Sequence, residues 1–283
     1  MIYLLLAIAS SSSLAIFMRL SGKYVKNEMG MFMANYGICS VLSVGMMTEP
    51  LGKVMSSGTG LIVGLGLITG VLYLAAFALQ KYNMVHNGIV LTSTFSKLGI
   101  LIPTLMAVVV FGEKPGMIQA AGILLAITAI VMVQFEKEAL KEGRKKIWLL
   151  AVLIACGTAD AMSAIYEKTG NPAGKDGFLL MIFATALVLA AGLAFRDHFN
   201  GTAKISKADL LFGLLIGIPN YYSTRFLLLA LGSMEAVIVY PVAGVSVLIV
   251  VTIAGLLCFR EKLSRKKATA ILMIAAALAL INM

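Results

Sequence analysis

The chain has 283 residues, of which 60% are hydrophobic and only 13% are charged. A soluble domain is usually about 45–50% apolar and about 25% charged, so this composition excludes an ordinary soluble domain and indicates a protein whose solvent is lipid. The formal net charge is +10. We exclude nucleic acid as a partner, because the basic residues sit in short stretches between apolar runs rather than on one face.

Ten stretches are long and apolar enough to predict transmembrane helices, each of which needs about 20 mostly apolar residues. In chain order they cover residues 2–21, 31–48, 60–80, 86–110, 117–135, 147–167, 177–195, 209–231, 234–258 and 267–282. Charge and amide groups predict a turn from Lys81 to Asn87, between the third and fourth spans. Gly232-Ser233 is predicted to be the turn between the eighth and ninth spans.

An internal repeat divides the chain near its midpoint. The pattern Phe-x-Glu-Lys at residues 111–114 recurs at residues 259–262, an offset of 148 residues. We therefore predict a first repeat at 1–136, a basic connector at 137–146 and a second repeat at 147–283. Each repeat holds five spans, and an odd number makes the second copy enter the membrane from the opposite side. The predicted fold is an all-α integral membrane protein with ten transmembrane helices in two inverted five-helix repeats.

The end of the fourth span carries a family resemblance. Phe111-Gly112-Glu113, followed by Gln119-Ala120-Ala121-Gly122, resembles the drug/metabolite transporter superfamily, in particular its ten-helix EamA-type members. The second half departs from the pattern, because Arg260 stands where the family has a glycine. The resemblance implies a central cavity lined mainly by helices 1, 3, 4, 6, 8 and 9, which opens to each side in turn. From the residues alone, Glu113 and its counterpart Glu261 are interpreted as structural anchors at helix ends, with gating as the alternative.

Polar groups far from the helix ends are the candidate substrate-binding residues, because a charge at mid-bilayer costs about 2.5–3.5 kcal/mol and usually faces a wet cavity or a partner. The charged candidates are Lys97, Asp160 and Arg225. The uncharged candidates are Tyr73, Ser93, Thr94, Tyr221, Tyr222 and Tyr240. The candidates for proton coupling or gating are Asp160, Glu167 and Arg19.

Each of these residues also has a structural interpretation. Lys97 or Arg225 could simply pair with Asp160, and a buried tyrosine often needs only a hydrogen-bond partner. Tyr221 and Arg225 are four residues apart, so they are predicted to share one helix face. Pro219 lacks a backbone N–H and predicts a kink or a local opening of the helix just before them.

The balance of charges at depth favours one function. Lys97 and Arg225 face one clear central carboxylate, Asp160, so a carboxylate on the substrate would complete the balance. We expect a secondary transporter that moves a small anionic or zwitterionic metabolite, such as an amino acid, by alternating access. The alternative is an exporter of organic cations or drugs, choline- or guanidinium-like, that uses Asp160 and Glu167 with tyrosine faces.

A membrane enzyme or lipid-handling protein is the third hypothesis. No nucleophile elbow, metal motif or nucleotide-binding loop supports it, so we expect no catalysis, no metal and no cofactor. The expected partners are a small-molecule substrate, a coupling proton and the lipid bilayer. The chain is expected to be a multi-pass protein of a bacterial cytoplasmic membrane.

The distribution of Lys and Arg predicts the orientation. They concentrate in the first, third, fifth, seventh and ninth connectors, so the positive-inside rule places both termini outside. Members of the resembling family are usually described with both termini in the cytoplasm, which conflicts with this count.

Overall fold

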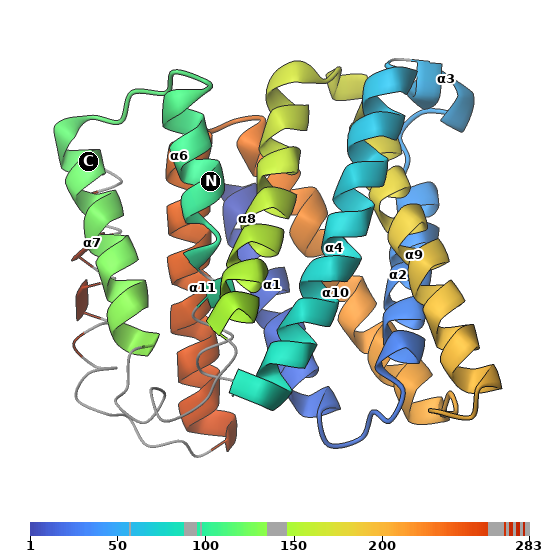
Figure 1. The fold of residues 1–283 in the computed structure, drawn as a ribbon. Helices are drawn as coiled ribbons and strands as arrows, with labels where there is room; N and C mark the ends of the chain where they lie inside the picture. Colours follow the sequence, from blue (N-terminus) through green and yellow to red (C-terminus); the bar gives the residue numbers. More distant parts are fainter. Residues whose placement is uncertain are drawn as a thin grey trace. The chain divides into compact units, whose positions relative to one another are not determined.

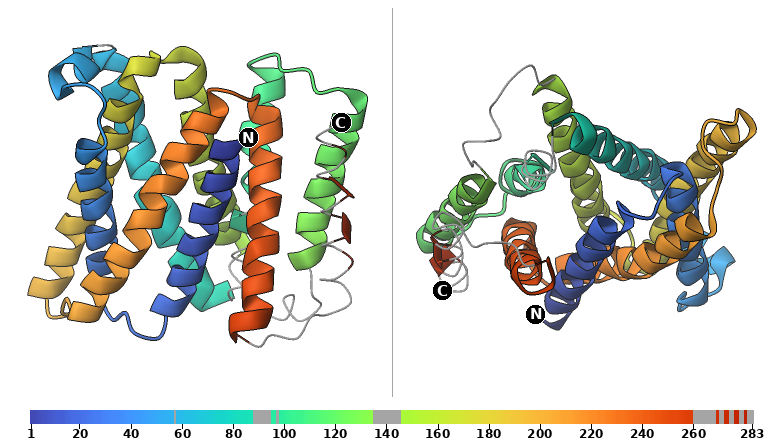
Figure 2. Two further views of the ribbon diagram at one scale, coloured as in Figure 1. Left: turned by 180° about the vertical axis from the view of Figure 1, so that it is seen from behind. Right: turned by 90° about the horizontal axis from the view of Figure 1, so that it is seen from below.

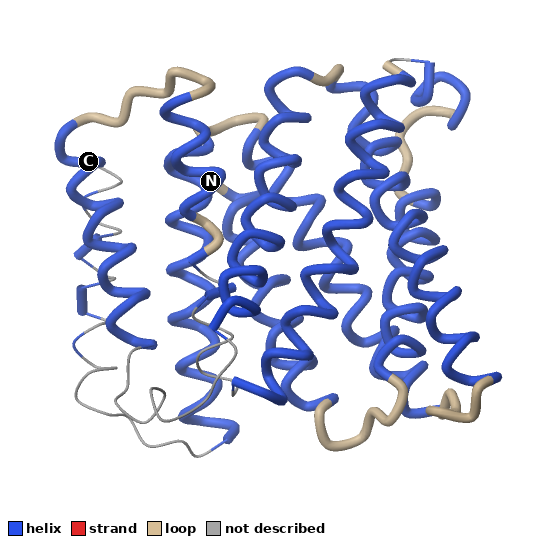
Figure 3. Tube along the Cα trace, in the orientation of Figure 1, coloured by secondary structure: helices blue, strands red, loops and turns tan. Residues whose placement is uncertain are grey.

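The computed structural model describes residues 1–56, 58–87, 95–96, 98–134 and 146–259, together with 269, 272–273, 276–277 and 280. Within this part of the chain every regular element is a helix, and no strand occurs (Figure 3). The predictions for Ser93, Thr94, Lys97, Glu261, the connector at 137–145 and most of the span at 267–282 lie outside the described residues.

Figure 1 shows the helices of the described residues in chain order. They are α1 (Ile2–Ser21), α2 (Glu28–Gly45), α3 (Leu51–Ser56), α4 (Thr59–Asn87), α6 (Leu101–Val109), α7 (Met117–Gln134), α8 (Lys146–Thr169), the short 3-10 helix η2 (Pro172–Gly174), α9 (Lys175–Phe199), α10 (Lys207–Leu231) and α11 (Ala236–Phe259). By length and composition, five stretches of the described chain can cross a membrane: Ile2–Ser21, Thr59–Asn83, Ile147–Thr169, Pro172–Phe199 and Lys207–Leu231.

One predicted turn is wrong and another is confirmed. The stretch from Lys81 to Asn87 is helical, because α4 continues to Asn87. Neither glycine nor proline interrupts it, and the Asn83 amide donates to the carbonyl oxygens of Leu79 (2.8 Å) on α4 and Trp148 (3.0 Å) on α8, so the polar group is satisfied without ending the helix. The turn at Gly232 is present, between the end of α10 and the start of α11.

The chain forms two compact units. Unit 1 comprises Met1–Leu74 and Ile165–Leu229, and unit 2 comprises Ala75–Ala164 and Ala230–Met283. Both α4 and α8 pass from one unit into the other. Each unit therefore takes helices from both predicted repeats, so the compact units and the repeats are different divisions of the chain.

In unit 1, α2 and α9 lie side by side (Figure 2), and glycines bring two further helix pairs into close contact. On α4, a Cβ at Gly70 would come within 2.6 Å of the Ile182 carbonyl oxygen of α9. On α10, a Cβ at Gly213 would come within 2.5 Å of the Met31 carbonyl oxygen of α2. One turn away on the same helices, a Cβ at Gly66 would come within 2.5 Å of Met181 Cβ, and a Cβ at Gly217 within 2.6 Å of the Asn35 carbonyl oxygen. Small residues at such contacts let helices pack backbone to backbone, as in membrane proteins generally.

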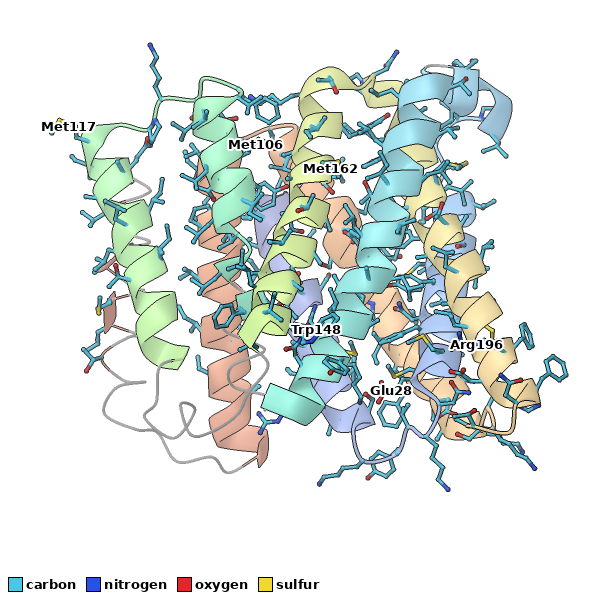
Figure 4. All side chains as sticks on the ribbon, in the orientation of Figure 1. Glu28, Met106, Met117, Trp148, Met162 and Arg196 are labelled. Atoms are coloured by element: carbon cyan, nitrogen blue, oxygen red, sulfur yellow. The ribbon has the colours of Figure 1, made fainter. Side chains whose placement is uncertain are left out.

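The α1–α2 and α9–α10 connectors meet at one end of unit 1. The Lys26 backbone N–H donates to the Asp209 carboxylate (2.8 Å), and the Asn27 amide donates to the Ala203 carbonyl oxygen (2.7 Å). Glu28 and Arg196 mark the same end in Figure 4. The opposite end of unit 1 carries α3, η2 and the start of α9, where the candidate site lies.

In unit 2, the carboxylate of Glu113 holds the first turn of α11. It is buried, and it accepts hydrogen bonds from the backbone N–H groups of Val237 (2.9 Å) and Ala236 (3.4 Å). These N–H groups have no partner within their own helix, and a negative charge is favoured at a helix N-terminus. This geometry agrees with the interpretation of Glu113 as a structural anchor.

Candidate functional site

Two ion pairs in unit 1 form the strongest candidate site. The Arg225 guanidinium of α10 binds the Asp176 carboxylate in the first turn of α9, with Nη1 and Oδ1 3.0 Å apart. The Lys175 ammonium binds Glu167 near the end of α8, with Nζ and Oε1 2.7 Å apart. Lys175 and Asp176 are neighbours in the chain, so both ion pairs involve the first turn of α9. We call these four residues the paired-charge cluster.

The paired-charge cluster is largely withdrawn from solvent. The Arg225 and Asp176 side chains are 19% and 12% exposed, and those of Lys175 and Glu167 are 18% and 10% exposed. All four residues belong to stretches long and apolar enough to cross a membrane. Ionisable groups in such helices are expensive to bury and are by default candidates for a functional site.

Asp176 is held firmly in place. Its Oδ2 accepts hydrogen bonds from the backbone N–H (3.2 Å) and the hydroxyl (3.3 Å) of Thr48, and Oδ1 binds Arg225. Its position in the first turn of α9 adds the favourable field of a helix N-terminus. Both oxygens of Asp176 therefore have protein partners.

Arg225 is only partly engaged. Its Nη1 donates a hydrogen bond to the Tyr221 hydroxyl and forms the ion pair with Asp176, so the predicted shared face of Tyr221 and Arg225 is confirmed. Nε and Nη2 donate to no atom of the described residues. The guanidinium thus keeps an edge with two parallel N–H directions, the geometry that suits a carboxylate.

Glu167 is also only partly engaged. One oxygen binds Lys175, whereas Oε2 is buried and accepts no hydrogen bond from the described residues. A buried carboxylate oxygen without a donor is costly, and such an exception calls for an explanation. The paired-charge cluster therefore has one unused donor edge and one unused acceptor.

A row of aromatic rings crosses unit 1 beside Arg225. Tyr73 of α4 meets Phe183 of α9 edge-on (centroids 6.2 Å apart), and Phe183 lies 6.1 Å from Tyr221. Tyr222 then contacts Tyr221 (5.2 Å) and stacks on Phe226 (5.6 Å). These faces give the region around the guanidinium an apolar wall with polar edges.

The structure places the predicted site residues in two groups. Tyr73, Glu167, Tyr221, Tyr222 and Arg225 all lie in unit 1, around or next to the paired-charge cluster. Of the other described candidates, Tyr240 donates to the Asp160 carbonyl oxygen (2.6 Å) within unit 2, and Arg19, in unit 1, is exposed in the last turn of α1.

The partner expected for Arg225 is wrong. Its counter-charge is Asp176 rather than Asp160, so Arg225 is not an uncompensated cation. Pro219 lies inside α10, which runs from Lys207 to Leu231, and the kink or local opening expected there stays a prediction.

Sequence reasoning missed Asp176, Lys175 and Thr48. The seventh span was predicted to begin at residue 177, which left Lys175 and Asp176 in the connector, whereas α9 begins at Lys175. The signal was an acidic residue directly before an apolar run, where helix N-termini favour negative charge. Among the described residues, no group of three His, Cys, Asp or Glu side chains is arranged to hold a metal ion.

Comparisons with known proteins support the fold and leave the function open. No protein-family model matches the chain. An uncharacterized protein of Haemophilus influenzae is 21% identical over 204 residues, which cover 70% of this chain and 68% of that protein. A protein of known crystal structure is similar over 99% of this chain and 94% of its own, with a TM-score of 0.70 and 13% sequence identity. At this identity the likeness is one of fold alone.

Proposed function

We propose that the chain is a secondary transporter that moves a small anionic or zwitterionic metabolite across a bacterial cell membrane by alternating access. The observation that carries this proposal is the paired-charge cluster, four charged groups only 10–19% exposed within stretches of membrane-spanning length. Burying charge in such helices is costly, so it is usually retained where a polar solute must bind. In this proposal the cluster binds its solute and catalyses no reaction.

The proposed architecture is that of ten helices in two inverted repeats, as in EamA-type drug/metabolite transporters. Its support in unit 1 is a reciprocal pattern of packing. The third span, in α4, packs through glycines on the seventh, in α9, and the eighth, in α10, packs through glycines on the second, in α2. In a five-helix repeat, spans two and seven correspond, as do three and eight, so a two-fold relation requires both contacts together.

A specific observation also favours the second candidate, an exporter of organic cations or drugs. Asp176 adds a carboxylate next to Glu167, and the aromatic row offers ring faces that attract cations. The competing argument is that Arg225 and Lys175 lie in the same cluster and repel a free cation. We therefore keep the anionic or zwitterionic substrate as the leading proposal.

Electrical recording on a solid-supported membrane tests the proposal without a labelled substrate. Purified chain in proteoliposomes is challenged with carboxylates, amino acids and quaternary amines, with and without a proton gradient. We expect currents or coupled proton movement with carboxylates or amino acids, and their loss in Arg225→Gln. The matched control is Arg196→Gln, which removes an arginine from the exposed pair with Asp197. Activity with quaternary amines alone would favour the cation exporter, and no response to any solute would contradict transport.

We also propose that both termini lie outside the cell. In unit 1, Lys23, Lys26, Lys204 and Lys207 lie in or beside the two connectors at one end, which the positive-inside rule assigns to the cytoplasm. In a variant without native cysteines, an impermeant maleimide should label Lys53→Cys, at the other end, in intact cells. It should label Lys204→Cys only after the cells are opened. The reverse pattern would invert the proposed orientation.

A further inference from the structure

The paired-charge cluster carries an inference about the substrate that rests on the proposed transport function. Its four side chains are two cations, Arg225 and Lys175, and two anions, Asp176 and Glu167. The cluster is therefore neutral before any solute arrives. A ligand with a net charge would leave one charge without compensation in a poorly solvated place, which is costly.

The unused hydrogen-bonding groups of the cluster have opposite signs. Nε and Nη2 of Arg225 are donors that no described residue uses, and they suit a carboxylate held by two parallel hydrogen bonds. Oε2 of Glu167 is a buried acceptor that receives no hydrogen bond from the described residues. It suits a strong donor such as an ammonium group.

We propose that the site takes a zwitterion, a solute with one carboxylate and one ammonium group, and that Glu167 Oε2 receives the ammonium while Arg225 receives the carboxylate. Such a solute brings no net charge, so the cluster stays neutral when it is occupied. Both unused groups gain charge-assisted hydrogen bonds at the same time. Lys175 and Asp176 hold the two receiving groups in place through their ion pairs.

The inference assigns Glu167 the binding of a substrate ammonium in a zwitterion site, whereas the sequence suggested coupling or gating, or cation binding in an exporter. It also separates this site from one for simple carboxylates, which would use Arg225 and leave Glu167 Oε2 unsatisfied. The row of aromatic rings from Tyr73 to Phe226 is compatible with solutes that have an apolar portion between or beside the two charged groups.

Matched probes of three charge types test the inference on the purified full-length chain. The zwitterions are the common L-amino acids and the ω-amino acids from glycine to 6-aminohexanoate. The comparison probes are straight-chain carboxylates and straight-chain amines of the same lengths. Thermal shifts and calorimetric titration give affinity, and counterflow in proteoliposomes shows whether each probe is exchanged.

We expect the best zwitterion to bind at least tenfold more tightly than the carboxylate or amine of matched length. Glu167→Gln should weaken the zwitterion at least tenfold and change carboxylate affinity less than twofold. Glu167→Gln leaves the Lys175 ammonium without its carboxylate partner. The double variant Glu167→Gln with Lys175→Gln makes the same test in a cluster whose net charge is again zero. Asp197→Asn, which removes a carboxylate from an exposed pair, is the matched control.

The outcomes separate this inference from the transport proposal. If a carboxylate or an amine binds as tightly as every zwitterion and is exchanged, the zwitterion site is wrong, but the proposal of transport remains valid. Equal weakening of zwitterion and carboxylate in both Glu167 variants overturns the role of Glu167. If no probe binds or is exchanged, the transport proposal itself fails.

Discussion

Two glutamates, one in each unit, are both largely withdrawn from solvent and have different kinds of partner. Glu113 in unit 2 is 6% exposed and accepts hydrogen bonds from two backbone N–H groups at the start of α11. The Glu167 side chain in unit 1 is 10% exposed. Its Oε1 binds the Lys175 side chain, and its Oε2 accepts no hydrogen bond from the described residues. Burial and residue type alone therefore do not show which of the two glutamates is structural and which could bind a ligand.

The difference lies in what a ligand could replace. A backbone N–H at a helix end is fixed by the helix, so its carboxylate partner is part of the scaffold. A lysine side chain can rotate away, and an unused oxygen is open to a new donor. The partners of a buried charge, rather than its burial, therefore indicate whether it supports the fold or binds a solute.

The largest expected effect is the loss of stability in Glu113→Ala. It removes the acceptor of two buried N–H groups, each of which costs about 1–3 kcal/mol when unsatisfied, so we expect a loss of about 2–3 kcal/mol. The measurement is the midpoint of thermal unfolding in detergent, together with ligand affinity in the folded fraction. Affinity should stay within twofold of the parent protein.

Glu167→Gln is the partner experiment for that comparison. It should weaken the binding of a zwitterion. It should also shift the unfolding midpoint less than Glu113→Ala does. A fall in stability as large as that of Glu113→Ala, with unchanged affinity, would place Glu167 in the scaffold and remove the distinction between the two glutamates.

The sequence predicted local features well and long-range partners poorly. The four-residue spacing of Tyr221 and Arg225 was enough to place them on one face, because that relation depends only on helix geometry. The partner of Arg225 is 49 residues away in the chain and on another helix, so spacing could not reveal it. The sequence instead favoured Asp160, because it stood in the middle of a span whereas Asp176 fell just outside one.

The boundary errors have a common physical cause. Lys81 to Asn87 and Lys175-Asp176 are polar, so hydropathy places them outside helices, yet backbone hydrogen bonding continues through them. Asn83 shows how this is tolerated, since its amide finds carbonyl oxygens on α4 and α8. Hydropathy reports the preferred solvent of a segment, and polar side chains with protein partners extend the helix beyond that limit.

The smaller expected effect concerns Arg225→Lys. Lysine keeps the positive charge next to Asp176, so the unfolding midpoint should change little, but it loses the planar edge that can bind a carboxylate with two hydrogen bonds. We expect the dissociation constant of a carboxylate-bearing ligand to rise at least tenfold, about 1.4 kcal/mol. Tyr222→Phe should have a smaller effect, because its ring stacking on Phe226 survives the loss of the hydroxyl.

Calorimetric titration of the parent protein, Arg225→Lys, Tyr222→Phe and the control Arg196→Lys decides the point. Arg196 makes the same kind of contact with a carboxylate, Asp197, but in an exposed pair at the other end of unit 1. Its replacement should leave affinity unchanged, because an exposed pair is worth little and lies away from the cluster. If Arg225→Lys binds as tightly as the control, Arg225 acts as a plain positive charge for Asp176. Both ion pairs of the cluster would then have a structural role, as Glu113 has, rather than a role in binding a ligand.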